Sequence, residues 1–162
     1  ISISPPGLGE GEARLVKDLQ DFWRTNQAVQ PYANLEIFLL RNLPRVGVGF
    51  FRRSGFYPDF ILWIKDKATK VKHVQFLEPH GLRLSGGLAG NEDKIEAFKE
   101  LQRLSREPTF HSKRITMAGY LLTETKLEDI HDAKGKSWIT LERDYRVLLQ
   151  EGNYIAKILK TG

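Results

Sequence analysis

Two acidic residues stand at the ends of two apolar segments, and their placement predicts a shared site. Asp59 precedes the apolar run 60–64, and Glu78 follows the run 74–77. If these runs pair as an antiparallel hairpin, both carboxylates lie at the same end of the sheet. Neighbouring carboxylates repel each other, and a proton or a hard divalent cation such as Mg²⁺ relieves the repulsion. Metal-dependent cleavage of nucleic acid is therefore the leading functional hypothesis.

Further residues of suitable chemistry accompany this pair. His80 stands two positions after Glu78, so in a strand the two side chains share a face. Pro79 between them donates no backbone hydrogen bond, which is typical of a strand end or a sheet edge. Glu36 lies in the apolar segment 35–43, which we expect to form a short buried helix, and a buried carboxylate needs a partner. Each acid alone is also explained as a solvated turn residue, but the combination of three is more specific.

Hydrophobic spacing predicts the elements that position these side chains. Leu15, Leu19, Phe22 and Trp23 recur at the spacing of an amphipathic helix that starts near Glu10. The pattern then predicts an α/β fold, with a mixed sheet of four or five strands flanked by helices. After the helix at 35–43, the expected elements are strands over 46–51, 60–64 and 71–77, a glycine-rich loop over 81–90, a helix from 92 that ends before 108, a strand over 115–123, a short helix introduced by the capping-box spacing of Thr125 and Glu128, a strand over 147–149 and a closing helix over 154–159.

Composition bounds the class of protein. The 162 residues are 41% hydrophobic, enough for one core, so we expect an arm or linker over 1–9 and one domain over 10–162. The 25 basic and 20 acidic residues give a net charge of +5, which favours a polyanionic partner. Cysteine is absent, which excludes thiolate metal sites and fits a reducing cytoplasm. No apolar run reaches the length of a membrane span, so we expect no membrane association.

Two sequence strings carry a resemblance to a known family. Residues 38–43 read FLLRNL, residues 56–63 read FYPDFILW and include Asp59, and Glu78, Pro79 and His80 follow further along the chain. This arrangement resembles the PD-(D/E)xK nuclease superfamily over about residues 34–105, and more narrowly the nuclease domain after the helicase in type III restriction and DEAD-like helicase proteins. The resemblance implies a restriction-endonuclease-like fold and DNA hydrolysis with Mg²⁺ or Mn²⁺. Asp59 and Glu78 would be metal ligands, with Glu36 as an accessory ligand, in a module that acts with a helicase or translocase region of the same polypeptide.

The chain departs from the superfamily pattern at one catalytic position. A Lys is usual two residues after the second acid, and this chain has His80 there. A Lys offers a compact cation to the attacking water or the phosphate, whereas a His offers one only when it is protonated. Some superfamily members carry the Lys on the next helix, where Lys94 is the candidate in this chain. An ordinary solvated helix lysine is the alternative interpretation of Lys94.

Four arginines are candidates for phosphate contact. Arg41, Arg45, Arg52 and Arg53 cluster in sequence near the expected acid site, although ordinary surface charge also explains them. Two other functions remain open beside the nuclease. The first is a catalytically weak or inactive nuclease-like domain that binds DNA or docks, which the His at position 80 motivates. The second is a small-molecule α/β enzyme that uses the same acids with a metal.

Overall fold

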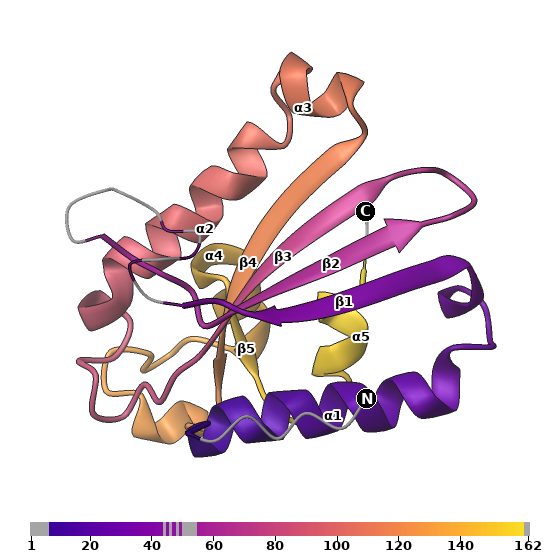
Figure 1. Cartoon of the computed structure of the whole chain (residues 1–162). Coiled ribbons are helices and arrows are strands. Elements are labelled where there is room, and N and C mark those ends of the chain that lie inside the picture. Colours follow the sequence, from indigo (N-terminus) through magenta and orange to yellow (C-terminus); the bar gives the residue numbers. More distant parts are fainter. Residues whose placement is uncertain (1–6, 44, 46, 48, 50–54, 161–162) are drawn as a thin grey trace.

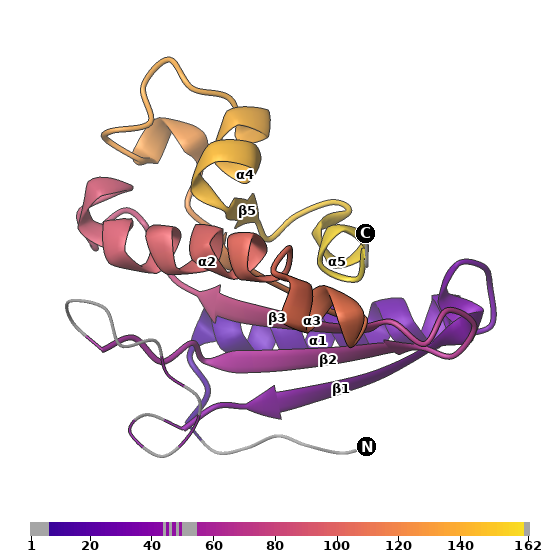
Figure 2. The ribbon, with the colours of Figure 1, turned by 90° about the horizontal axis from the view of Figure 1, so that it is seen from above.

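A five-stranded mixed sheet forms the centre of the molecule, with helices on both faces (Figures 1 and 2). The structure is a computed structural model, and it describes residues 7–43, 45, 47, 49 and 55–160. The strands follow one another across the sheet in chain order, from β1 to β5. Their bounds are β1 (Leu35–Arg41), β2 (Phe60–Asp66), β3 (Lys72–Pro79), β4 (Ile115–Thr123) and β5 (Val147–Leu149). This architecture confirms the predicted α/β class and mixed sheet.

The direction of the strands changes in the middle of the sheet. β1, β2 and β3 form an antiparallel meander, whereas β4 is parallel to β3 and β5 is parallel to β4. A parallel neighbour needs a crossover, which α2 (Glu92–Leu104) and the short α3 (Pro108–Ser112) provide between β3 and β4. The other helices are α1 (Glu10–Asn26), α4 (Trp138–Tyr145) and α5 (Tyr154–Ile158), with 3₁₀ turns at Tyr32–Asn34, Ala89–Asn91 and Leu127–Asp129. Among the described helices, none combines the length and the apolar character that crossing a bilayer requires.

The alternation of side chains along the strands gives the sheet two cores. On one face, Ile61 and Phe76 pack in a cluster with Ile95 and Phe98 of α2. On the other face, β2 and β3 residues pack with Leu15 and Leu19 of α1 and with residues of α5. α2 therefore lies on the face to which the odd-numbered residues of β2 and the even-numbered residues of β3 belong.

The predicted elements agree with the structure except at the first apolar segment and in parts of the C-terminal half. Segment 35–43 is not a helix: residues Leu35–Arg41 form β1, so that prediction is wrong. Leu35, Ile37 and Leu39 pack towards the α1 core, while Phe38 and Leu40 on the opposite face are exposed. An apolar strand with two apolar faces therefore imitates a buried helix. The predicted strand over 46–51 falls largely outside the described residues.

The C-terminal half contains smaller differences. The helices α3 and α4 were not predicted, whereas β4 and β5 have the predicted bounds. The expected capping box does not form, because Lys126 is the residue at the start of the 3₁₀ turn. The Thr125 hydroxyl accepts a hydrogen bond from the Leu82 backbone N–H at 3.0 Å and so ties the loop after β3 to the end of β4.

Candidate active site

The two predicted acids meet at one end of the β2–β3 hairpin. Phe60 pairs with Leu77 in the antiparallel register, which places Asp59 across from Glu78. The Asp59 backbone N–H donates to Glu78 Oε2 at 3.0 Å. Glu78 is buried, whereas Asp59 is partly exposed. The hairpin predicted from the apolar runs is thus present, and it brings both acids to the same place.

Lys94 reaches the same place from α2. Its Nζ donates to Glu78 Oε1 at 2.7 Å, so both oxygens of Glu78 accept a hydrogen bond. Ile95 and Phe98 anchor α2 in the core, and Lys94 Nζ also lies 5.4 Å from the centre of the Phe56 ring. A long helical side chain points back towards the N-terminus of its helix, which in α2 is the end nearest the strand end. The structure therefore joins the lysine of the next helix to the second acid.

Asp59 lies in surroundings that disfavour its negative charge. Burial first, and then the nearby charges of Glu78 and Glu12, raise its pKa to about 7 against the opposing charge of Lys94. The carboxyl group therefore releases its proton near neutral pH in the metal-free protein. Carboxyl groups that lie close together repel each other unless a proton or a cation lies between them. A carboxyl pKa raised in this way is typical of a cation site, and structural ion-pair networks also shift pKa values.

Glu12 of α1 is the acid that sequence reasoning missed. It stands in the first turn of α1, where its Oε2 accepts from the Gly9 backbone N–H at 2.6 Å. Its Oε1 lies 3.8 Å from the Arg41 guanidinium, and its charge acts on Asp59. The one local signal was the acid at the third position of a helix, which by itself indicates a capping box. Its approach to Asp59 depends on the packing of α1 against the sheet.

His80 lies beside the same charges. Its backbone N–H donates to the Leu122 carbonyl at 2.7 Å, which extends the β3–β4 pairing past Pro79. Burial lowers the pKa of the imidazole, the charge of Lys94 lowers it further, and Glu78 opposes this. The lowered pKa favours the neutral ring, so His80 is a weaker source of positive charge than a Lys at this position.

Glu36 does not lie at the site. The prediction that it is an accessory metal ligand beside Asp59 and Glu78 is therefore wrong. It pairs with Lys65 in the β1–β2 register, whereas the acid end of that ladder is the pair Arg41 and Phe60. Its Oε2 lies 3.8 Å from Lys65 Nζ at the surface. The distance along β2 from position 65 to Asp59 is about 20 Å, too far for a shared ion.

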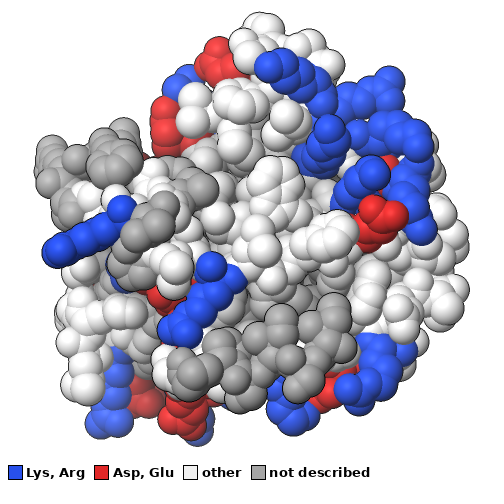
Figure 3. Space-filling view, viewed as in Figure 1, with Lys and Arg blue, Asp and Glu red and all other residues white. Residues whose placement is uncertain are grey.

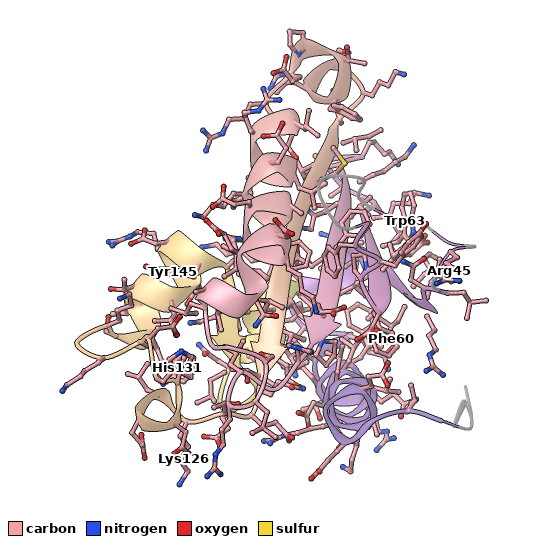
Figure 4. The ribbon with its side chains drawn as sticks, turned by 90° about the vertical axis from the view of Figure 1, so that its left-hand side faces the viewer. Arg45, Phe60, Trp63, Lys126, His131 and Tyr145 are labelled. Atoms are coloured by element: carbon pink, nitrogen blue, oxygen red, sulfur yellow. The ribbon has the colours of Figure 1, made fainter. Side chains whose placement is uncertain are left out.

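The four predicted phosphate-contacting arginines have different outcomes. The Arg41 guanidinium lies near Glu12 and donates to the Gly7 carbonyl at 3.3 Å, and Arg41 pairs with Phe60 on the sheet face opposite to the one that carries the two acids. Arg45 is exposed with a left-handed backbone (φ 64°), and Figure 4 shows it on the side of the molecule that carries Trp63. Arg52 and Arg53 lie outside the described residues. A phosphate role for the group stays a prediction.

The carboxylates fit one mode of magnesium binding. Mg²⁺ commonly keeps several waters and takes one or two carboxylates together with substrate phosphates. Asp59 and Glu78 supply two such carboxylates, and each carboxylate oxygen has further acceptor capacity beyond its hydrogen bonds. Over the described ranges, no group of three or more His, Asp and Glu side chains is arranged to hold a metal. The donor set thus fits a cation shared with substrate and water.

Comparison with protein-family models, with curated proteins and with solved structures found no match for this chain. The resemblance to PD-(D/E)xK nucleases therefore stays a prediction that the residues of this chain carry.

Proposed function

We propose that this domain is a Mg²⁺-dependent deoxyribonuclease that hydrolyses phosphodiester bonds at the Asp59–Glu78 end of the sheet. The observation that carries the proposal is the convergence of two carboxylates and the Lys94 ammonium at one partly exposed strand end. Two carboxylates beside a lysine are residue types that can catalyse metal-assisted phosphodiester hydrolysis. The resemblance of the segment around Asp59 to PD-(D/E)xK nucleases supports the same chemistry.

Each side chain has a role in this proposal. A bound Mg²⁺ or Mn²⁺ would lower the pKa of the attacking water and neutralise charge on the scissile phosphate. Asp59 and Glu78 would hold that ion through their oxygens. Lys94 and the Asp59 backbone N–H fix the orientation of the Glu78 carboxylate. The Lys94 ammonium also supplies the positive charge near the phosphate that a neutral His80 does not.

One observation favours a second candidate function, a nuclease-like domain that binds DNA without cutting it. The buried Glu78 already has a cationic partner in Lys94 at 2.7 Å, so its charge is balanced without a metal. Removal of one partner from a buried ion pair is strongly destabilising, so this pair has a structural role that does not depend on catalysis. The nuclease remains the better supported function because the charge of Lys94 only partly offsets the raised pKa of Asp59, so this second carboxyl group is left for a cation to stabilise.

The setting of the domain is part of the proposal. The resemblance to helicase-associated nuclease domains supports a module that works with a helicase or translocase region of the same polypeptide on DNA. The absence of cysteine supports a cytoplasmic location, where structural disulfides are rare.

The decisive experiment compares Asp59→Ala with a matched acidic control. Wild-type protein is incubated with single-stranded and duplex DNA and either Mg²⁺ or Mn²⁺. We expect Asp59→Ala to lower the cleavage rate by about 100-fold or more. Glu36→Gln removes an acid on the same face of the sheet at the far end, and it should leave the rate unchanged.

Two outcomes separate the candidate functions. Full cleavage by Asp59→Ala would refute the nuclease assignment to this site. Tight DNA binding by the wild type with no cutting in either metal would instead establish the binding domain.

A further inference from the structure

The sheet face that carries the two acids also carries an ordered series of side chains. Across β1, β2 and β3, the register places Glu36, Lys65 and Lys72 in one row, then Phe38, Trp63 and Val74, then Leu40, Ile61 and Phe76. The Asn42 backbone N–H donates to the Asp59 carbonyl, so Asn42, Asp59 and Glu78 form the next row. Paired residues point to one face of a sheet, and successive rows are about 7 Å apart. One face therefore leads from lysines through aromatic residues to the candidate active site.

The middle of this face is apolar and exposed. Phe38 is 57% exposed, Leu40 51% and Trp63 43%. α2 packs over β3 and β4, and in Figure 4 Trp63 lies to the side of that helix, outside the area it covers. Phe38 and Trp63 are direct cross-strand partners, about 13 Å along the strand from Asp59. We call Phe38, Leu40 and Trp63 the aromatic face.

Basic residues gather at the end of the aromatic face away from the acids. Lys65 and Lys72 occupy the last row, and the β2–β3 turn adds Lys67 and Lys70. The Arg114 guanidinium joins them, since it donates to the Thr69 carbonyl of that turn at 2.9 Å. Figure 3 shows Lys and Arg clustered at the upper right of the view, over this turn, with uncharged surface beside them. Glu36 and Asp66 are the acids within this group of cations, and the exposed charge is predominantly positive.

We propose that this face binds single-stranded nucleic acid, with bases stacked on Trp63 and Phe38 and phosphates at the lysines of the β2–β3 turn. Exposed aromatic rings beside cations bind unpaired bases regardless of sequence, because every base has a flat π face. A duplex hides those base faces in its own stack, so it gains nothing from the rings. The part of the proposal that leads the strand to Asp59 and Glu78 rests on the nuclease function, whereas the binding itself does not.

The test measures binding without metal, so that cutting plays no part. Fluorescence anisotropy in EDTA reports the affinity for a labelled oligothymidylate of about 15 nucleotides and for a blunt duplex of similar length. Trp63→Ala should weaken oligothymidylate binding about 5- to 150-fold and duplex binding less than about twofold. Trp63→Phe keeps a ring and should retain most of the affinity. Ile139→Ala, which removes a 75% exposed side chain on α4, is the matched control and should change neither affinity.

The outcomes distinguish this proposal from the nuclease proposal. Binding of oligothymidylate by the wild type, with loss of affinity in Trp63→Ala but no cleavage in Mg²⁺ or Mn²⁺, would refute the nuclease alone. Equal affinity of Trp63→Ala and the wild type for oligothymidylate, or equal loss on both probes, would overturn the single-strand site. A wild type that binds no oligothymidylate, and that is a dimer which Trp63→Ala converts to a monomer, would assign the aromatic face to a second copy of the chain.

Discussion

Replacing Asp59 by Asn should stabilise the protein at alkaline pH, because it removes a carboxylate that the fold disfavours. The pKa of Asp59 is raised from 3.8 to about 7 in the folded protein. A shift of about 3 pKa units corresponds to roughly 4 kcal/mol as an upper limit, at about 1.36 kcal/mol per unit. Asp59 is partly exposed, and solvent screening reduces the expected effect to roughly 2 kcal/mol.

The sign of the pH dependence follows from proton binding. Between pH 3.8 and about 7 the folded state holds a proton on Asp59 that the unfolded state has released. The free energy of unfolding contributed by this group therefore falls as pH rises through that window. Asn carries no charge at any pH. The stabilising effect of Asp59→Asn should consequently be near zero at pH 4 and fully present at pH 8.

Urea denaturation in EDTA at pH 4 and pH 8 measures this difference, with the slope of the transition checked for constancy. Asp66→Asn is the matched control on the same strand. Backbone hydrogen bonds from Thr69 and Ala68 lower the pKa of Asp66, so its removal should destabilise the protein at pH 8, the opposite sign. If Asp59→Asn is no more stable than the wild type at pH 8, or is equally stabilised at both pH values, the repulsion we describe is absent.

Three further changes test other parts of the structure. Lys94→Met should abolish most DNA cleavage and lower the free energy of unfolding by about 1–3 kcal/mol in urea melts, because it leaves a buried carboxylate without its cation. Glu36→Gln should keep the cleavage rate within about twofold and stability within about 1 kcal/mol, since its pair with a lysine is at the surface; a larger loss in the cleavage assay would contradict its placement. Gly119→Ala should destabilise the protein by about 1–3 kcal/mol in urea melts, because the added Cβ would lie 2.0 Å from Phe98 Cδ1, and an unchanged midpoint would show that α2 moves aside at little cost.

The hairpin that carries the acids was predictable because local signals agreed. The segments 60–64 and 71–77 are separated by a polar turn rich in Lys, which indicates two strands and one short connection. The predicted bounds of β4 and of the short β5 also agree with the structure. Once two strands are antiparallel, the residues at their facing ends must lie together. The Asp59 and Glu78 pair therefore required no knowledge of tertiary packing.

β1 was not predicted as a strand because its outward face carries apolar residues. A half-buried edge strand normally alternates apolar and polar residues, and that alternation reveals it. In β1 the outward positions hold Phe38 and Leu40, so the segment is apolar on both faces and has no strand period. The exposed apolar residues of β1 therefore removed the alternation of apolar and polar residues that would have indicated a strand. Glu12 was hidden for a different reason, because its approach to Asp59 joins segments 47 positions apart in the chain.

The position of Lys94 on α2 explains why a histidine is suitable at position 80. A Lys at position 80 and a Lys at position 94 would both direct an ammonium towards Glu78, and two cations beside one buried carboxylate repel each other. Lys94 occupies that place at 2.7 Å, and its charge is one reason why the pKa of His80 is lowered. A side chain that stays neutral at pH 7 is therefore the compatible choice at position 80. His80 and Lys94 therefore form one arrangement. In it, Lys94 on α2 carries the positive charge beside Glu78, and position 80 on the strand carries a side chain without a permanent charge.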